Sequence, residues 1–208
     1  MLIKVCGMCD AVNIREVAAL GINLMGFIFY PKSPRYFYSK EGNEAMLRLL
    51  PLKKVGVFVD APKSEIQAMA IRLNLDYLQL HGNESPEDCR ALCRLGFSLI
   101  KAFSIASEAD LDRTKDYEDY VDYFLFDTKC STFGGSGRSF DWSLLSAYHC
   151  KTPFLLSGGI ALSSVEAIYG FRHPAFAGVD LNSGFETAPG VKNVQQLREF
   201  VELIRNKQ

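Results

Sequence analysis

The feature that most restricts the fold of this chain is a regular alternation of short apolar runs with amphipathic stretches. The apolar runs are rich in β-branched and aromatic side chains, which is typical of buried strands. Strands that alternate with helices in this way favour a parallel sheet, because each helix returns the chain to the same edge. The predicted strands are 2–5, 24–29, 54–59, 77–80, 98–102, 123–126, 154–156 and 176–179.

Helical periodicity fills the segments between these runs. The clearest local signal is Ser85 before Pro86, with Asp88 three residues after the serine, which predicts a capped helix start. Gly21 is a predicted helix end, because glycine readily takes the left-handed conformation found there. The remaining predicted helices are 41–50, 66–73, 108–117, 142–147, 163–169 and 194–204.

Eight strand–helix units fit into 208 residues without a long linker or a break in composition. An open doubly wound sheet is one way to arrange them. A closed (β/α)8 barrel is favoured, because it pairs every strand edge. We therefore predict an α/β protein with one barrel domain over residues 1–208, whose core is supplied by the 48% of residues that are hydrophobic.

Composition argues against several classes of partner. The formal net charge is −1 and lysine and arginine are dispersed, so we expect no nucleic-acid partner. No apolar run approaches the roughly 18 residues of a membrane span, so we expect no membrane association and a cytoplasmic location. The six cysteines are then expected to be reduced thiols.

In a barrel of this kind the working face lies at the carboxyl ends of the strands. Functional residue types follow several predicted strands at that face, although they are far apart in the sequence. They are Cys6, Asp60, His81, Asp127 and Asp180.

Three glycine-containing segments follow the last three strands. They include Gly135, Ser136 and Gly137; Gly158 and Gly159; and Asn182, Ser183 and Gly184. Glycine lets backbone N–H groups approach an anion, and barrels often bind phosphate with the loops after strands seven and eight. Tight turns alone would explain one such loop, but three at one mouth favour a phosphate site.

Cys6 and Asp127 each have a structural alternative, as a small core residue and as a loop cap. Together, beside a phosphate site, they suggest proton transfer on a sugar phosphate, with a thiolate as base and a carboxyl as acid. We interpret His81 mainly as a structural residue bonded to a neighbouring loop. Asp180 either orients its loop or contacts substrate hydroxyls. Cys9, three residues after Cys6, raises the alternative of a metal or dithiol site.

A metal site normally needs about four ligands, often from two cysteine pairs. Cys89 and Cys93 are spaced differently, and we expect them on the outer face of their helix. We therefore predict no metal site, and we treat Cys9 as a neighbour that could oxidise onto Cys6.

Motifs along the whole chain resemble those of phosphoribosylanthranilate isomerases, barrel enzymes of tryptophan biosynthesis. Cys9 departs from the commoner family pattern, in which a small polar residue often stands at that position. The matching segments are KVCGM at 4–8, GFIF at 26–29, SPR at 33–35, VGVFV at 55–59, QLHG at 79–82, LFDTK at 125–129, GGSG at 134–137, FDW at 140–142, LSGGI at 156–160 and VDLNSGFE at 179–186.

The resemblance implies an Amadori rearrangement of N-(5'-phosphoribosyl)anthranilate, a small-molecule substrate, without metal or organic cofactor. It implies Cys6 as general base, Asp127 as general acid and Arg35 as a partner of the anthranilate carboxylate. The alternatives are another sugar-phosphate isomerase or epimerase, or a barrel that only binds a phosphorylated ligand. We expect a monomer or a homodimer.

Overall fold

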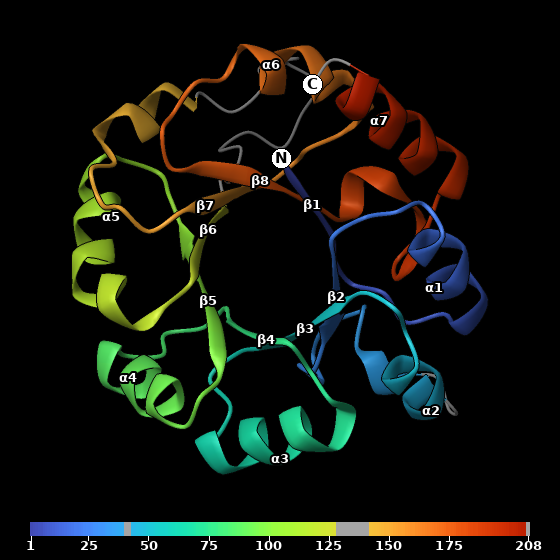
Figure 1. Cartoon of the computed structure of the whole chain (residues 1–208), viewed down its shortest axis with the longest axis horizontal. Helices are drawn as coiled ribbons and strands as arrows, with labels where there is room; N and C mark the ends of the chain where they lie inside the picture. Colours follow the sequence, from blue (N-terminus) through green and yellow to red (C-terminus); the bar gives the residue numbers. More distant parts are fainter. Residues whose placement is uncertain (40–42, 128–141, 207–208) are drawn as a thin grey trace.

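Eight parallel strands form a closed barrel in the computed structural model, which describes residues 1–39, 43–127 and 142–206 (Figure 1). Neighbouring strands pair in sequence order and β1 pairs with β8, which closes the ring. The predicted barrel is therefore confirmed and the open sheet is excluded. The strands are β1 (Leu2–Val5), β2 (Leu24–Ile28), β3 (Lys53–Phe58), β4 (Tyr77–Leu80), β5 (Ser98–Ser104), β6 (Tyr123–Asp127), β7 (Phe154–Ser157) and β8 (Phe176–Leu181).

Helices cover the outside of the barrel, and most occupy the predicted segments (Figure 1). They are α1 (Ala11–Ala18), α2 (Asn43–Arg48), α3 (Lys63–Leu73), α4 (Pro86–Arg94), α5 (Ala109–Asp112), α6 (Val165–Gly170) and α7 (Val194–Asn206). The start of α4 is as predicted, because the Ser85 hydroxyl accepts the Asp88 N–H at 3.2 Å and the Asp88 carboxylate accepts the Ser85 N–H at 3.0 Å.

The prediction of one helix over 108–117 is wrong in detail. Only the four residues of α5 are α-helical, and a 3₁₀ helix, η2 (Arg113–Tyr120), follows directly. Only Leu111, Thr114 and Tyr117 of this segment are buried, at intervals of three, which matches the three-residue turn of a 3₁₀ helix. The segment after β6 likewise ends in a 3₁₀ helix, η3 (Trp142–Ala147), rather than an α-helix.

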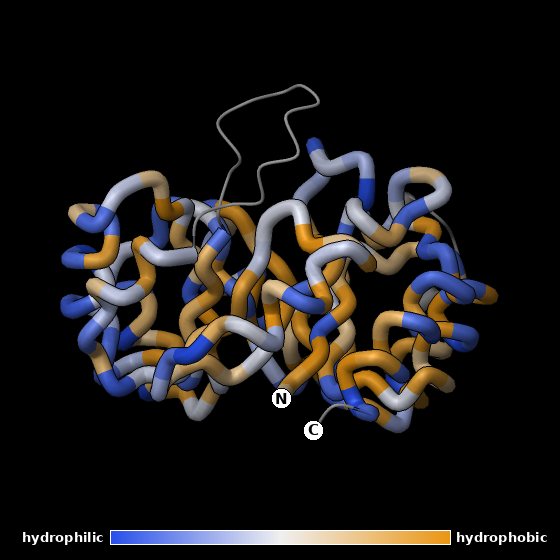
Figure 2. Tube along the Cα trace, turned by 90° about the horizontal axis from the view of Figure 1, so that it is seen from above, coloured by the Kyte–Doolittle hydropathy of each residue, from blue (hydrophilic) through white to orange (hydrophobic). Residues whose placement is uncertain are grey.

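Apolar side chains pack on both sides of the barrel wall. One set lies between the strands and the helices, and the smaller set fills the barrel interior. This division follows from the two-residue period of a strand, which turns alternate side chains to opposite faces. Figure 2 shows the strands as mainly hydrophobic and the outer helices as mixed. The inner set is Leu24, Val55, Ile100, Ala102, Leu125 and Leu155.

Both termini lie on one side of the barrel, the side where β1 begins (Figure 2). The carboxyl ends of the strands, and the loops that follow them, are therefore on the opposite side. A short hairpin of β9 (Glu186–Ala188) and β10 (Val191–Lys192) follows β8 and η5 (Ser183–Phe185). This hairpin was not predicted, although Pro189-Gly190 is a common turn pair and Gly190 has a φ of 80°.

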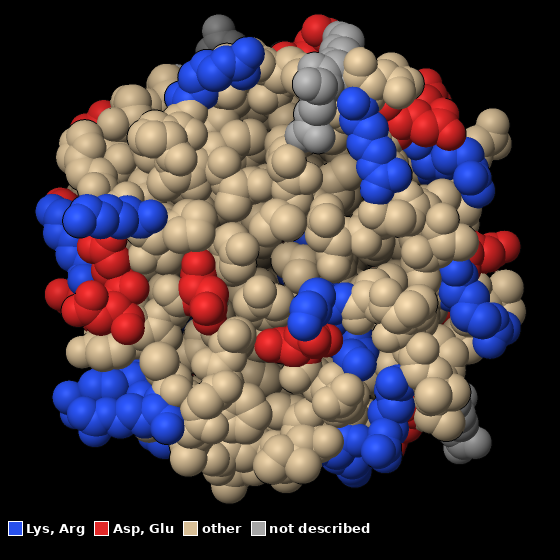
Figure 3. Space-filling view, in the orientation of Figure 1, with Lys and Arg blue, Asp and Glu red and all other residues tan. Residues whose placement is uncertain are grey.

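The outer surface carries charges of both signs. Figure 3 shows one face of the molecule, on which lysine and arginine alternate with aspartate and glutamate around the rim. Within the described ranges, no helix has the length and apolar character to cross a membrane.

Candidate active site at the barrel mouth

Cys6 follows β1 and is almost fully buried, with 3% of its surface exposed. Its backbone N–H donates to the Leu181 carbonyl at 2.8 Å, so the thiol is held next to the end of β8. The neighbouring strand contributes Gly26, where a Cβ atom would lie 2.6 Å from the Cys6 Sγ. Glycine at that position therefore makes room for the thiol.

A buried ion pair lies next to this thiol. The Lys4 Nζ donates to Asp180 Oδ1 at 2.9 Å, and both side chains are buried. The two residues are paired in the β1–β8 register, and Lys4 shares the inward face of β1 with Cys6 because the two positions are two residues apart. Asp180 was predicted to end its strand, but β8 continues through Leu181 and the carboxylate points into the barrel.

The surroundings of Cys6 shift the pKa of its thiol in opposite directions. Burial raises the pKa of the Cys6 thiol, the Lys4 ammonium lowers it, and the Asp180 carboxylate raises it, leaving the pKa above its ordinary value. Burial alone would lower the pKa of Lys4, but Asp180 and Cys6 raise it above its ordinary value. Lys4 is therefore the cation that contacts the thiol and opposes the effect of burial.

Asp127 lies at the end of β6, and His81 directly follows β4. The His81 Nε2 is 3.8 Å from Asp127 Oδ2, and both side chains are partly exposed. On its other side, His81 Nδ1 is 2.8 Å from the Gln79 Nε2. Asp180 interacts electrostatically with both His81 and Asp127, and also with Cys6, so these groups share one end of the barrel.

Arg35 forms an ion pair that the sequence analysis did not predict. Its guanidinium donates to the Glu186 carboxylate through Nε at 2.8 and 3.0 Å and through Nη2 at 2.6 Å. The Lys192 Nζ also donates to Glu186 at 2.6 Å and to Asn182 Oδ1 at 2.7 Å. Burial by itself would raise the pKa of Glu186, but its bonds from Arg35 and Lys192 lower it below the ordinary value.

This cluster borders the thiol. A Cβ at Gly7, whose φ is 76°, would lie 2.7 Å from the Arg35 Cδ and 2.8 Å from the Asn182 Oδ1. The residue after Cys6 is therefore enclosed by Arg35, which binds Glu186, and by Asn182, which accepts from Lys192. Two cations and one carboxylate leave the cluster with a net charge of one positive unit beside the site.

The predicted phosphate loops lie side by side where the structure describes them. Gly158 and Gly159 have φ values of 92° and 64°, a conformation that favours glycine. Gly184 approaches the Ile160 carbonyl so closely that a Cβ would overlap it. The exposed Ser183 begins η5, next to Gly184. Gly135, Ser136 and Gly137 lie outside the described residues.

The Cys9 thiol donates to the Gly190 carbonyl in the hairpin turn, with sulfur and oxygen 3.6 Å apart. None of the five described cysteines is in a disulfide. Among the described residues, no group of three or more His, Cys, Asp and Glu side chains is arranged to hold a metal ion. Cys89 was expected on an outer face, but it is fully buried against the core, whereas Cys93 is exposed.

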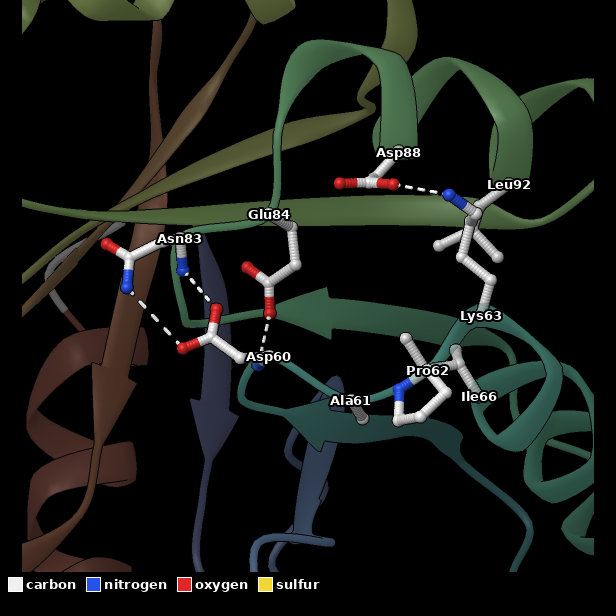
Figure 4. Close-up of a pocket in the computed structure, with 9 residues that line it drawn as sticks. All are labelled: Asp60, Ala61, Pro62, Lys63, Ile66, Asn83, Glu84, Asp88 and Leu92. Carbon is white, nitrogen blue, oxygen red and sulfur yellow. Dashed lines mark hydrogen bonds and ion pairs between the residues drawn. The ribbon is translucent and has the colours of Figure 1, made fainter.

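A second buried ion pair was also missed. The Lys101 Nζ donates to Glu84 Oε2 at 3.0 Å and to the carbonyls of Leu80 and Gly82. Glu84 in turn accepts the Asp60 N–H at 2.9 Å (Figure 4). This pair fixes the loops after β3 and β4.

Asp60, which the sequence placed at the mouth, is held in the loops by Asn83. Its carboxylate accepts the Asn83 N–H at 2.6 Å and the Asn83 side-chain amide at 3.4 Å (Figure 4). The pocket beside it, of about 290 Å³, lies between α3 and α4 and is lined by Pro62, Ile66 and Asp88 among others.

Comparison with known proteins agrees with this geometry. The family model described as N-(5'phosphoribosyl)anthranilate (PRA) isomerase matches residues 3–203. The N-(5'-phosphoribosyl)anthranilate isomerase of Parabacteroides distasonis is 56% identical over 98% of this chain and 93% of that protein. The protein of the same name from Phocaeicola vulgatus is 46% identical over 100% of this chain and 99% of that protein.

Solved structures give the same result. The crystal structure of phosphoribosyl anthranilate isomerase from Thermotoga maritima superposes with a TM-score of 0.84 at 32% identity, covering 99% of this chain and all of that one. A second isomerase structure, with a TM-score of 0.80 at 29% identity, was determined in complex with reduced 1-(o-carboxyphenylamino)-1-deoxyribulose 5-phosphate. It covers 99% of this chain and all of that one. This chain therefore belongs to the N-(5'-phosphoribosyl)anthranilate isomerase family and is an isomerase.

Proposed function

We propose that this enzyme converts N-(5'-phosphoribosyl)anthranilate to 1-(o-carboxyphenylamino)-1-deoxyribulose 5-phosphate by an Amadori rearrangement, with Asp127 as general acid and Cys6 as general base, in tryptophan biosynthesis. The observation that carries the proposal is the arrangement of Cys6, Asp127 and Asp180 at one end of the barrel, with Lys4 in contact with the thiol. The family membership and the complex of a relative with the reduced product support the substrate.

The reaction begins when Asp127 donates a proton to the ring oxygen of the ribose. The bond from that oxygen to C1' breaks, and the nitrogen lone pair forms an iminium. The Cys6 thiolate then removes the proton from C2', and the electrons of that C–H bond form the enolamine. Tautomerisation of the enolamine moves a proton from the C2' hydroxyl to C1' and gives the ketone. The substrate has gained one proton at the ring oxygen and lost one from C2', so its formula is unchanged. Proton exchange with water returns Cys6 to the thiolate and Asp127 to the acid.

Lys4 is the group that favours the thiolate in this scheme. A thiol has an ordinary pKa near ~8.5, and burial raises that of Cys6 further. The ammonium of Lys4, itself fully buried, opposes this effect at close range. Its pairing with Asp180 keeps Lys4 charged, because the pKa of Lys4 is raised above its ordinary value.

Arg35 and the glycine loops would bind the two ends of the substrate. Glu186 occupies Nε and Nη2 of Arg35, which leaves Nη1 to donate to the anthranilate carboxylate. The net positive charge of the Arg35, Lys192 and Glu186 cluster matches one carboxylate. The phosphate would accept N–H bonds from Gly158, Gly159 and the residues near Gly184, together with the GGSG segment around Ser136.

Turnover of freshly generated phosphoribosylanthranilate, followed by the loss of its anthranilate fluorescence, tests the proposal. Cys6→Ala and Asp127→Asn should each lower kcat by about 10²-fold or more. Cys9→Ser is the matched control and should retain activity, because that thiol contacts the Gly190 carbonyl rather than the reacting atoms. Wild-type protein that folds and binds inorganic phosphate without turnover would instead support a barrel that only binds a phosphorylated ligand.

A further inference from the structure

We propose that Gln79 is a positioning residue that keeps the His81 proton on Nε2, the ring nitrogen that faces Asp127. The acid–base scheme above gives neither Gln79 nor His81 a role. The location of the proton follows from the contacts of the side chains alone. Its effect on the reaction rests on the proposed function of Asp127.

The argument begins with the position of Gln79 in its strand. Gln79 and His81 are two residues apart, so β4 turns both side chains into the barrel. Gln79 is buried, with 1% of its surface exposed. Its Nε2 is 2.8 Å from His81 Nδ1. An amide nitrogen only donates, so the Nδ1 of His81 must accept and carries no proton. A neutral imidazole then has its proton on Nε2.

The orientation of the amide is consistent with the charges around it. His81 Nε2 lies 3.8 Å from Asp127 Oδ2, and Asp180 also acts electrostatically on His81. Reversing the amide would place the proton on Nδ1 and direct the Nε2 lone pair at the Asp127 carboxylate. Those two groups would then repel each other. The orientation with the amide nitrogen toward His81 avoids that repulsion.

The amide makes this bond while its own oxygen is left unsatisfied. Gln79 Oε1 is buried and has no hydrogen-bond partner within the described residues. A buried acceptor without a partner is costly, so a side chain chosen for packing alone would not carry one. An apolar residue of similar size would remove this cost. It would also no longer fix which ring nitrogen of His81 carries the proton.

The proton on Nε2 has a direct consequence for Asp127. When Asp127 has given its proton to the substrate, the resulting carboxylate faces an N–H dipole rather than a lone pair. The dipole attracts the carboxylate that proton transfer leaves behind, whereas a lone pair would repel it. Gln79 contributes through His81 and does not touch the reacting atoms in this scheme.

Nitrogen NMR of protein labelled with ¹⁵N-histidine tests the proposal directly. Protonated and bare ring nitrogens resonate far apart, and the chain has only three histidines, His81, His149 and His173. His173 is an internal control. Its Nδ1 accepts the Ala175 N–H at 3.1 Å and its Nε2 lies 3.1 Å from the Tyr148 carbonyl, so it carries its proton on Nε2 whatever happens at Gln79.

Two substitutions at Gln79 change the hydrogen bond to His81 in different ways. In Gln79→Glu the side chain accepts instead of donating, so His81 should become protonated at Nδ1. In Gln79→Met the donor is lost and the signal should move to a mixture of both tautomers. Gln195→Glu, on the exposed face of α7, adds the same charge far from the site and should leave His81 unchanged. In Gln79→Glu, kcat should fall about 10-fold or more while KM changes little.

A wild-type spectrum with the proton on Nδ1 would overturn the proposal, even if neither variant folds. An Nδ1 that stays unprotonated in both folded Gln79 variants would also overturn it, with unchanged His173 signals as evidence of folding. A changed tautomer with unchanged kcat would refute the positioning role. If Asp127→Asn retains full turnover, the acid–base scheme fails while the wild-type tautomer still tests the contact of Gln79 with His81.

Discussion

Removing Lys4 should expose how strongly the site depends on its buried ion pair. Lys4→Met keeps the length and apolar stem of the side chain and deletes only the ammonium group. The Asp180 carboxylate then remains in the barrel without its partner, although it is 5% exposed and bonded to Lys4 at 2.9 Å in the wild type. Truncating one partner of a buried pair typically costs about 3–5 kcal/mol of unfolding free energy.

Protonation of Asp180 limits the size of this loss in stability. Asp180 can escape its unpaired charge by binding a proton, and at pH 7 this costs about 4 kcal/mol for a carboxyl with an unfolded pKa of about 3.9. We therefore expect a loss of about 3–4 kcal/mol at pH 7. At pH 5 the same protonation costs only about 1.5 kcal/mol, so the loss should fall to about that value.

The sign of the pH effect follows from the burial of Asp180. Burial raises the pKa of Asp180 and Lys4 is the strongest group that opposes that rise, so deleting Lys4 raises the pKa further. In the variant, the folded state then holds a proton that the unfolded state has lost above pH ~4. The stability of the variant should therefore fall as pH rises from about 4 toward the raised pKa, and it should be recovered at acid pH.

Urea unfolding of wild type, Lys4→Met and Lys4→Met/Asp180→Asn at pH 5 and 7 measures the effect. The double variant removes the unpaired charge and should recover most of the loss at pH 7. Lys53→Met, on β3, breaks a surface pair with Asp76. It is the matched control and should leave the unfolding midpoint almost unchanged. A Lys4→Met loss below about 1 kcal/mol at pH 7, or equal losses at both pH values, would refute the reasoning.

Three further predictions concern the hairpin and the glycine loops. Glu186→Gln should raise KM about 10-fold, because Arg35 loses the carboxylate that fixes two of its nitrogens; an unchanged KM in steady-state assays would contradict this. The same variant should lose less stability between pH 7 and pH 3 than wild type, as measured by urea unfolding, because the lowered pKa of Glu186 stabilises only wild type above pH ~4 and this contribution is lost below it. Gly184→Ala should weaken phosphate binding in calorimetry more than Gly159→Ala. A Cβ at Gly184 would overlap the Ile160 carbonyl, whereas at Gly159 it meets open space and only the φ of 64° is strained; equal effects would refute the comparison.

The barrel could be predicted from the sequence because each strand and helix has a local signal. The run of apolar residues in β2 and the Ser85 cap of α4 are signals of this kind, and both are present in the structure as predicted. The segment after β5 is mostly polar and has too few apolar residues to distinguish one helix from a short α-helix followed by a 3₁₀ helix.

The candidate site was only partly predictable, since its residues are positioned by partners distant in sequence. Cys6 and Asp127 could be chosen by residue type and strand end. The ion pair of Lys4 with Asp180 joins residues 176 positions apart, and that of Arg35 with Glu186 joins residues 151 positions apart. No pattern in the neighbouring sequence predicts such pairs. The contact of Gln79 with His81 is different, because the two-residue period of a strand would have placed both on one face.

The pairing of β1 with β8 has a consequence for how the enzyme becomes active during synthesis. Synthesis makes Cys6 and Lys4 well before Asp180, the carboxylate that holds this lysine. Until β8 has been made, the ring of strands is open and Lys4 has no Asp180 to pair with. The surroundings of the thiol are therefore completed only when β8 pairs with β1, the same step that closes the ring.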